Sequence, residues 1–207
     1  MLDSSRRVAV AREVKPLLPI FRDTVGRVRE SISDLVCALP AVPHLLKPVQ
    51  EITTDWPTAL HIVEDEADKF AAFGAADAAL AASGTVTTEL ALAGVPMVVA
   101  YRVGPLTAAV ARRLIRVPFA TLINLLLKRE AVPEFIQERC RPDLLAPALI
   151  RLFTDDGARA QQKKDLREAI HLLGVDDEPP SLRAARVLLD FVQERRAATA
   201  QRSSIRT

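Results

Sequence analysis

Residues 78–103 read AALAASGTVTTELALAGVPMVVAYRV, in the pattern of a strand, a turn, a helix and a second strand. The segment 78–82 is an unbroken apolar run, and the polar residues 83–85 follow it as a turn. Residues 86–93 can form a helix, which Gly94 and Pro96 end before the apolar run 97–101. The stretch therefore predicts a strand–helix–strand unit of a parallel sheet.

The turn at Ser83, Gly84 and Thr85 is a candidate phosphate site. Backbone N–H groups at the start of a helix lie at the positive end of its dipole, and small side chains let an anion approach them. Glu89 lies four residues after Thr85, so its carboxylate can face the same cleft and accept hydrogen bonds from sugar hydroxyls. A single Ser-Gly-Thr turn is a weak signal for a phosphate site. The alternative is therefore an ordinary tight turn of an α/β domain, with the Glu89 side chain in solvent.

The composition sets the class of protein. The chain has 207 residues, 49% of them hydrophobic, which suits one domain with a large core. Its formal net charge is +2, and with one Trp and one Tyr it offers few surfaces on which bases could stack, so no nucleic acid partner is expected. The three histidines and two cysteines lack metal-ligand spacing, so no metal site is expected and the thiols suit a reducing compartment.

The pattern upstream predicts a helix over 8–28, strands over 35–39 and 59–63, and helices over 44–55 and 68–76. This alternation predicts a parallel sheet with helices on both faces, in which ligands bind at the carboxyl ends of strands. The candidate contacts there are Arg6, Glu64, the 83–85 turn and Arg102. Arg6 could instead belong to a frayed terminus.

The downstream part contains further candidates. Residues 105–117 predict an amphipathic helix whose arginines face either solvent or an anionic membrane surface. Asn124 lies in an apolar run, where it is either a core residue with internal partners or a ligand contact. Glu134 and Gln137 follow Pro133 and can share one face of a helix. Helices are then predicted over 143–153, 157–173 and 181–195, followed by a disordered tail. No segment has the pattern of a signal peptide or a membrane-spanning helix.

Three stretches of the chain are notable together: the segment from Ala81 to Val103 with Glu89, the N-L-L sequence at 124–126 and the V-P-E-F-I-Q sequence at 132–137. In this order they resemble the family of lipid-A-disaccharide synthases, which are glycosyltransferases of the two-lobed GT-B architecture. The resemblance implies a Rossmann-like α/β lobe, a parallel sheet flanked by helices, that binds a nucleotide sugar. We expect this lobe to span residues 1–177, with a helical carboxyl-terminal extension and tail over 178–207.

The resemblance also implies a reaction, in which 2,3-diacylglucosamine is transferred from UDP-2,3-diacylglucosamine to lipid X (2,3-diacylglucosamine 1-phosphate) in lipid A biosynthesis. It implies that Gly84 and Thr85 seat the diphosphate, that Glu89 holds the ribose and that Arg102 adds positive charge. It places Arg6, Asn124, Glu134 and Gln137 near the donor. No metal or other cofactor is implied, because such enzymes offset the charge of the diphosphate with helix dipoles and cationic side chains.

The chain departs from the family in two ways. The family's Pro-Gly-Ser-Arg turn after a strand reads Asp3-Ser4-Ser5-Arg6 here. The family's amino-terminal lobe, which binds the acceptor and supplies the general base, has no counterpart, so we assign no catalytic residue and expect the chain to be inactive alone.

Two alternatives to the synthase stay open: a degenerate nucleotide-sugar-binding module without catalysis, and a fragment like a UDP-sugar epimerase. The resemblance implies a homodimer or a separately encoded amino-terminal lobe as a partner. It also implies a location in the cytoplasm or on the cytoplasmic face of the inner membrane.

Overall fold

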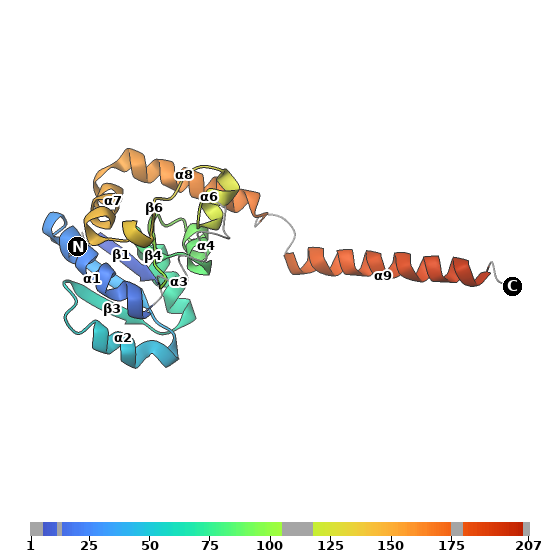
Figure 1. Cartoon of the computed structure of the whole chain (residues 1–207), viewed down its shortest axis with the longest axis horizontal. Coiled ribbons are helices and arrows are strands. Elements are labelled where there is room, and N and C mark those ends of the chain that lie inside the picture. Colours follow the sequence, from blue (N-terminus) through green and yellow to red (C-terminus); the bar gives the residue numbers. More distant parts are fainter. Residues whose placement is uncertain (1–5, 12–13, 105–117, 175–179, 205–207) are drawn as a thin grey trace. The chain divides into compact units, whose positions relative to one another are not determined.

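Six parallel strands form one sheet in the order β3-β2-β1-β4-β5-β6 in the computed structural model, which describes residues 6–11, 14–104, 118–174 and 180–204 (Figure 1). The strands are β1 (Arg6–Ala11), β2 (Leu35–Pro40), β3 (Ala59–Val63), β4 (Ala78–Ala82), β5 (Met97–Tyr101) and β6 (Glu134–Ile136). This order reverses direction between β1 and β4, as in Rossmann-type folds. The predicted α/β fold is confirmed.

Helices flank the sheet (Figure 1). They are α1 (Val14–Ser31), α2 (Leu46–Ile52), α3 (Glu66–Ala75), α4 (Thr85–Leu92), α6 (Leu122–Leu127), α7 (Pro142–Thr154) and α8 (Asp156–Leu172), with short 3-10 turns at Pro43–Leu45 and Gln137–Arg139. A further helix, α9 (Pro180–Ser204), follows in the chain. Helix α7 packs on α1 and on β4 and β5, whereas α3 packs on β1 and β3, and α4 on β4, β5 and α6.

Strand β4 lies in the middle of the sheet, and all five of its residues are buried. Its side chains are four alanines and Leu80, which let helices approach closely on both faces. The turn that follows β4 therefore starts from a rigid position at the point where the strand order reverses.

The helix predicted over 8–28 is wrong at its start, because Arg6–Ala11 form β1 and α1 begins at Val14. Strand β1 lies between β2 and β4, and Val8 has Cys37 and Ala78 as its register partners. The segment reads RRVAVA, and its valines and alanines suit either a strand or the start of the helix that follows, so the local pattern does not distinguish the two. Pairing on both edges, which only the tertiary structure provides, determines this conformation.

The helix predicted to carry Glu134 and Gln137 on one face is also wrong. Glu134 begins the edge strand β6 and is the register partner of Val99 on β5, while Gln137 begins a 3-10 turn. The carbonyl of Pro133 already accepts the Val99 N–H at 2.9 Å, so the segment is committed to the sheet where Pro133 enters it. The side chains of Glu134 and Gln137 therefore belong to different elements and share no helix face.

Both cysteines, Cys37 and Cys140, are free and buried. Burial raises the pKa of the Cys37 and Cys140 thiols. The hydroxyl of Thr58 donates a hydrogen bond to the Cys37 sulfur at 3.2 Å. The protonated form of each thiol is therefore favoured in the folded chain.

The chain divides into two compact units, residues 1–169 and 170–207, whereas the sequence suggests a boundary after 177. In the second unit α9 continues to Ser204, past Arg195 and into the expected tail. The predicted arginine-rich helix at 105–117 lies outside the described residues. Within the described ranges, no helix has the length and apolar character needed to cross a membrane.

Candidate functional site

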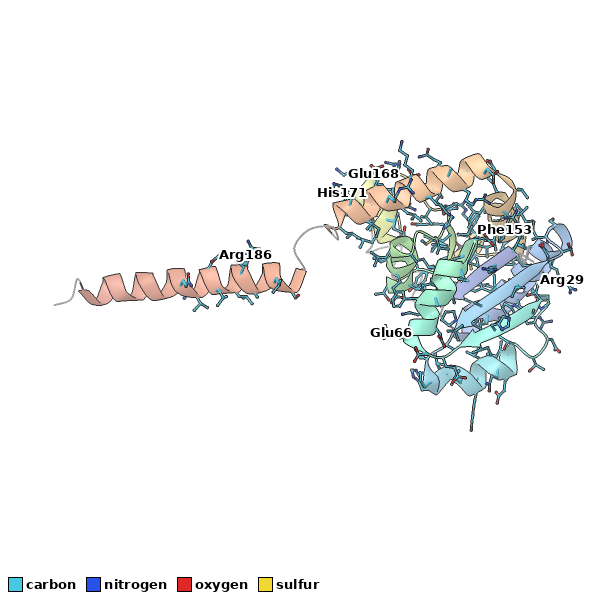
Figure 2. All side chains as sticks on the ribbon, turned by 180° about the vertical axis from the view of Figure 1, so that it is seen from behind. Arg29, Glu66, Phe153, Glu168, His171 and Arg186 are labelled. Atoms are coloured by element: carbon cyan, nitrogen blue, oxygen red, sulfur yellow. The ribbon has the colours of Figure 1, made fainter. Side chains whose placement is uncertain are left out.

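A pocket of about 340 Å³ lies at the carboxyl ends of β2, β3 and β4. Its apolar wall includes Leu18 and Phe21 of α1, Leu39 of β2, Val49 of α2 and Phe73 of α3. Its polar rim consists of Glu64, Asp65, Glu66, Lys69, Thr85 and Glu89. Figure 2 shows Glu66 at the start of α3. An apolar wall with a few converging polar groups suits a small ligand that has both an apolar part and polar groups.

The turn after β4 has the backbone geometry of an anion site. Gly84 has φ 145° and ψ −161°, a conformation that residues with a Cβ rarely adopt. Its carbonyl accepts hydrogen bonds from the Thr87 N–H at 3.1 Å and from the Thr87 hydroxyl at 2.7 Å, which starts α4. The N–H groups of Thr85 and Val86 then have no partner within the helix, and both residues line the pocket. The positive end of α4 is therefore available to an anion.

Glu89 lies one turn further along α4 and lines the same pocket as Thr85, as the sequence predicts. Its carboxylate oxygen Oε1 is 3.2 Å from the ammonium nitrogen of Lys69 on α3. The Glu89 side chain keeps 32% of its surface exposed, against 20% for Lys69. The pair therefore holds a partly exposed carboxylate at the pocket, where it can accept hydrogen bonds from hydroxyl groups.

Ser83 precedes this turn and contacts a different segment. Its hydroxyl donates to the carbonyl of Ala120 at 3.2 Å, and its N–H donates to the carbonyl of Ala100 at 3.3 Å. Ser83 does not line the pocket. Its hydroxyl thus ties the turn to the segment before α6, and the structure does not place it with Thr85 and Glu89.

Asn124 is fully buried and its side chain is saturated. Its Nδ2 donates to the carbonyl of Val132 and to Oε1 of Glu134, both at 2.7 Å. Its Oδ1 accepts the N–H groups of Ala131 at 2.8 Å and of Val132 at 2.9 Å. All four hydrogen-bonding positions of the amide are occupied, so Asn124 is a core residue in this state and has no capacity for a direct ligand contact.

Glu134 is the centre of the same network and is 6% exposed. Its Oε1 accepts from the Thr121 N–H at 2.9 Å and from the Thr121 hydroxyl at 2.6 Å, in addition to Asn124. Its Oε2 accepts from the Ala120 N–H at 2.7 Å. The carboxylate of Glu134 therefore fixes the Ala120–Thr121 segment. Because the carbonyl of Ala120 accepts the Ser83 hydroxyl, Glu134 supports the 83–85 turn only indirectly.

Gln137 and Arg102 also lie away from the pocket. Gln137 has φ 53°, and in the amide orientation that satisfies both groups its side chain is 3.2 Å from the N and 3.2 Å from the O of Val103. Arg102 follows β5 and is exposed. Its positive charge opposes the burial that raises the pKa of the Cys140 thiol. These residues stay at the carboxyl edge of the sheet but do not join Thr85 and Glu89.

Arg6 is the one candidate at the wrong edge of the sheet. Arg6 begins β1 and pairs in register with Leu35, the first residue of β2. It therefore lies at the amino end of its strand, whereas ligands of such sheets bind at the carboxyl ends. Its N–H donates to the carbonyl of Asp34 at 3.1 Å. The opposite edge carries the pocket, and we therefore leave Arg6 out of the site.

We expect Arg6→Ala to leave the affinity for UDP within about twofold, because surface substitutions away from a site change free energies by only about 0.5 kcal/mol. Titration calorimetry on the variant checks this. A loss of about tenfold or more would instead show that Arg6 reaches the ligand.

Lys69 is the functional candidate that the sequence did not suggest. Its only signal was its place in the helix that follows β3, next to the acidic turn at 64–66. Glu64, predicted as a contact at the end of β3, does line the pocket. Within the described ranges, no group of three or more His, Cys, Asp or Glu side chains is placed to hold a metal ion.

The fold is similar to that of solved glycosyltransferases. The CMP-Kdo binding domain of WaaA from Acinetobacter baumannii matches 80% of this chain and 89% of its own, with a TM-score of 0.58 and 13% identity. The calicheamicin glycosyltransferase CalG4 matches 93% of this chain and 44% of its own, with the same TM-score of 0.58 and 13% identity. At this identity the likeness concerns the fold alone.

Comparison of sequences is more specific. The model of the family "Lipid-A-disaccharide synthetase" matches residues 1–179. The lipid-A-disaccharide synthase of Nitrobacter winogradskyi is 42% identical over 95% of this chain and 49% of its own length, and that of Rhodospirillum centenum is 43% identical over 97% and 49%. The chain thus spans about half the length of the curated relatives it matches. On this match the chain belongs to the lipid-A-disaccharide synthetase family.

Proposed function

We propose that this chain is the donor-binding half of a lipid-A-disaccharide synthase and that its pocket binds the UDP part of UDP-2,3-diacylglucosamine. One observation carries the proposal: Thr85 at the amino end of α4 and Glu89 one turn later line the same pocket. This pairs an anion site with a hydroxyl-binding carboxylate at the edge of the sheet where nucleotides bind. The relatives are named lipid-A-disaccharide synthase, which supports a lipid A disaccharide as the product.

The charges at the rim orient the nucleotide. Glu64, Asp65 and Glu66 are exposed acids on the β3 side of the pocket, and they repel phosphates. The diphosphate therefore lies at the Gly84 turn, where the dipole of α4 favours negative charge. The ribose lies beside Glu89, and the base lies against the apolar wall that includes Phe21.

We place the acceptor lipid X and the general base outside this chain, because the relatives are about twice as long as the part they share with it. We propose that the chain works with an amino-terminal lobe or as a homodimer, in the cytoplasm or at the cytoplasmic face of the inner membrane. Membership of the synthetase family does not favour the epimerase alternative.

Titration calorimetry of UDP against the 207-residue chain tests the donor site. We expect saturable binding of UDP, and an affinity about tenfold lower for Glu89→Ala, because a hydrogen bond to a charged group contributes about 1.5–3 kcal/mol. Glu51→Ala on α2 is a matched control, because Glu51 is exposed and does not line the pocket. Absence of any heat of UDP binding by the unaltered chain would overturn the proposal.

The purified chain should form no disaccharide from UDP-2,3-diacylglucosamine and lipid X, because we place the acceptor site and its general base outside this chain. Addition of the amino-terminal half of a relative should restore product, which thin-layer chromatography detects. Product from the chain alone would contradict this division of roles. UDP binding with no product in the mixture would favour the degenerate binding module.

A further inference from the structure

The ammonium group of Lys69 is held in the pocket by three groups. It lies 3.2 Å from Oε1 of Glu89 and 3.7 Å from Oε1 of Glu66. It also lies over the ring of Phe70, 4.6 Å from the centroid. The Lys69 side chain is 20% exposed, so most of its length is packed. These contacts therefore restrain the ammonium group of Lys69 to one position between α3 and α4.

This contact occupies only one side of the Glu89 carboxylate. Oε1 faces Lys69, and among the described residues nothing is bonded to Oε2. A glutamate on a helix surface otherwise samples several rotamers, and binding would have to select one of them. The ion pair selects a rotamer before the ligand arrives and leaves Oε2 without a partner among the described residues, so that Oε2 can accept a hydrogen bond from a hydroxyl.

We propose that Lys69 is a positioning residue, which orients the Glu89 carboxylate for the ribose hydroxyls and thereby sets a preference for ribonucleotides over 2′-deoxyribonucleotides. This inference rests on the proposed function, in which the pocket binds UDP. Two carboxylates already share the charge of Lys69, so a direct role in binding the diphosphate is disfavoured. The diphosphate has the amino end of α4 instead.

The test compares UDP with 2′-deoxy-UDP by calorimetry on the full chain. We expect the unaltered chain to prefer UDP by about tenfold, since the lost hydroxyl removes a hydrogen bond to a charged acceptor. Lys69→Met should reduce this preference to about threefold or less. The affinity for UDP should fall, while the affinity for 2′-deoxy-UDP should stay nearly unchanged. Lys69→Arg should keep most of the preference, because a guanidinium can still pair with Glu89.

Lys69→Gln is a second neutral variant in case methionine disturbs folding, and circular dichroism checks the fold of each variant. Lys47→Met on α2 is the control, because Lys47 is exposed and does not line the pocket. An unchanged preference in the neutral variants, or an equal loss for both nucleotides, would overturn the role of Lys69. Failure of the unaltered chain to bind UDP would remove the proposed function itself, and this inference with it.

Discussion

Glu134→Ala should lower the midpoint of thermal unfolding by about 6–12 °C, since each kcal/mol shifts the midpoint of a chain of this size by about 2–4 °C. The substitution removes the acceptor from three buried donors, which are the Thr121 N–H, the Thr121 hydroxyl and the Asn124 amide, and from the partly buried N–H of Ala120. Unsatisfied buried donors cost about 1–3 kcal/mol each, and partial entry of water limits the total to about 3 kcal/mol. Scanning calorimetry measures the shift.

Glu134→Gln tests whether the network needs both acceptor oxygens of the carboxylate or only a side chain of the same size. A glutamine keeps one acceptor oxygen, but its amide N–H₂ then faces donors on the other side, so we expect a loss of stability that is measurable but smaller than the loss caused by alanine. Glu51→Ala, at an exposed position of α2, should leave the midpoint nearly unchanged. If the glutamine variant were as stable as the unaltered chain, the network would not depend on the carboxylate.

Gly84→Val should weaken UDP binding by about tenfold or more while leaving a folded chain. The cause is the backbone, because φ 145° is strained for any residue with a Cβ and most strained for a β-branched one. No atom lies within 4 Å of an added Cβ at this position, so a steric clash is not the reason. The turn should relax to another conformation and move the Thr85 N–H away from the diphosphate. Calorimetry with UDP measures the loss.

Gly74→Ala is the matched control for Gly84→Val. Gly74 lies inside α3 with no positive φ, and an added Cβ there also has nothing within 4 Å. Alanine at such a position should stabilise the helix by about 1 kcal/mol and leave UDP affinity unchanged. Equal UDP affinity in the Gly84 and Gly74 variants would show that the turn does not seat the diphosphate.

Much of the fold could be predicted because its signals are local. The strand at 78–82 is uniformly apolar, and glycines and prolines mark where the neighbouring elements end, so four strands and most helices followed from pattern alone. The turn with Gly84 and Thr85 and the carboxylate of Glu89 could be predicted for the same reason, because four residues on one helix set their spacing.

The same local reasoning failed where a residue's neighbours come from distant segments. Strand β1 is defined by its pairing with β2 and β4, and this pairing places Arg6 at the edge of the sheet opposite the pocket. Asn124 and Glu134 are ten residues apart, and only their contact shows that they satisfy each other in the core. Their residue types would suit a ligand equally well.

The sequence by itself determined the Rossmann-type pattern, the resemblance to the family and the placing of Thr85 and Glu89 on one helix, because each can be recognised from residues that are neighbours along the chain. Only the tertiary structure decided that Lys69 faces Glu89, that Glu134 lies inside the core and that Arg6 lies outside the site. The physical reason is that these three results depend on which segments the sheet brings together, and a hydrogen bond or ion pair exists only where both partners meet.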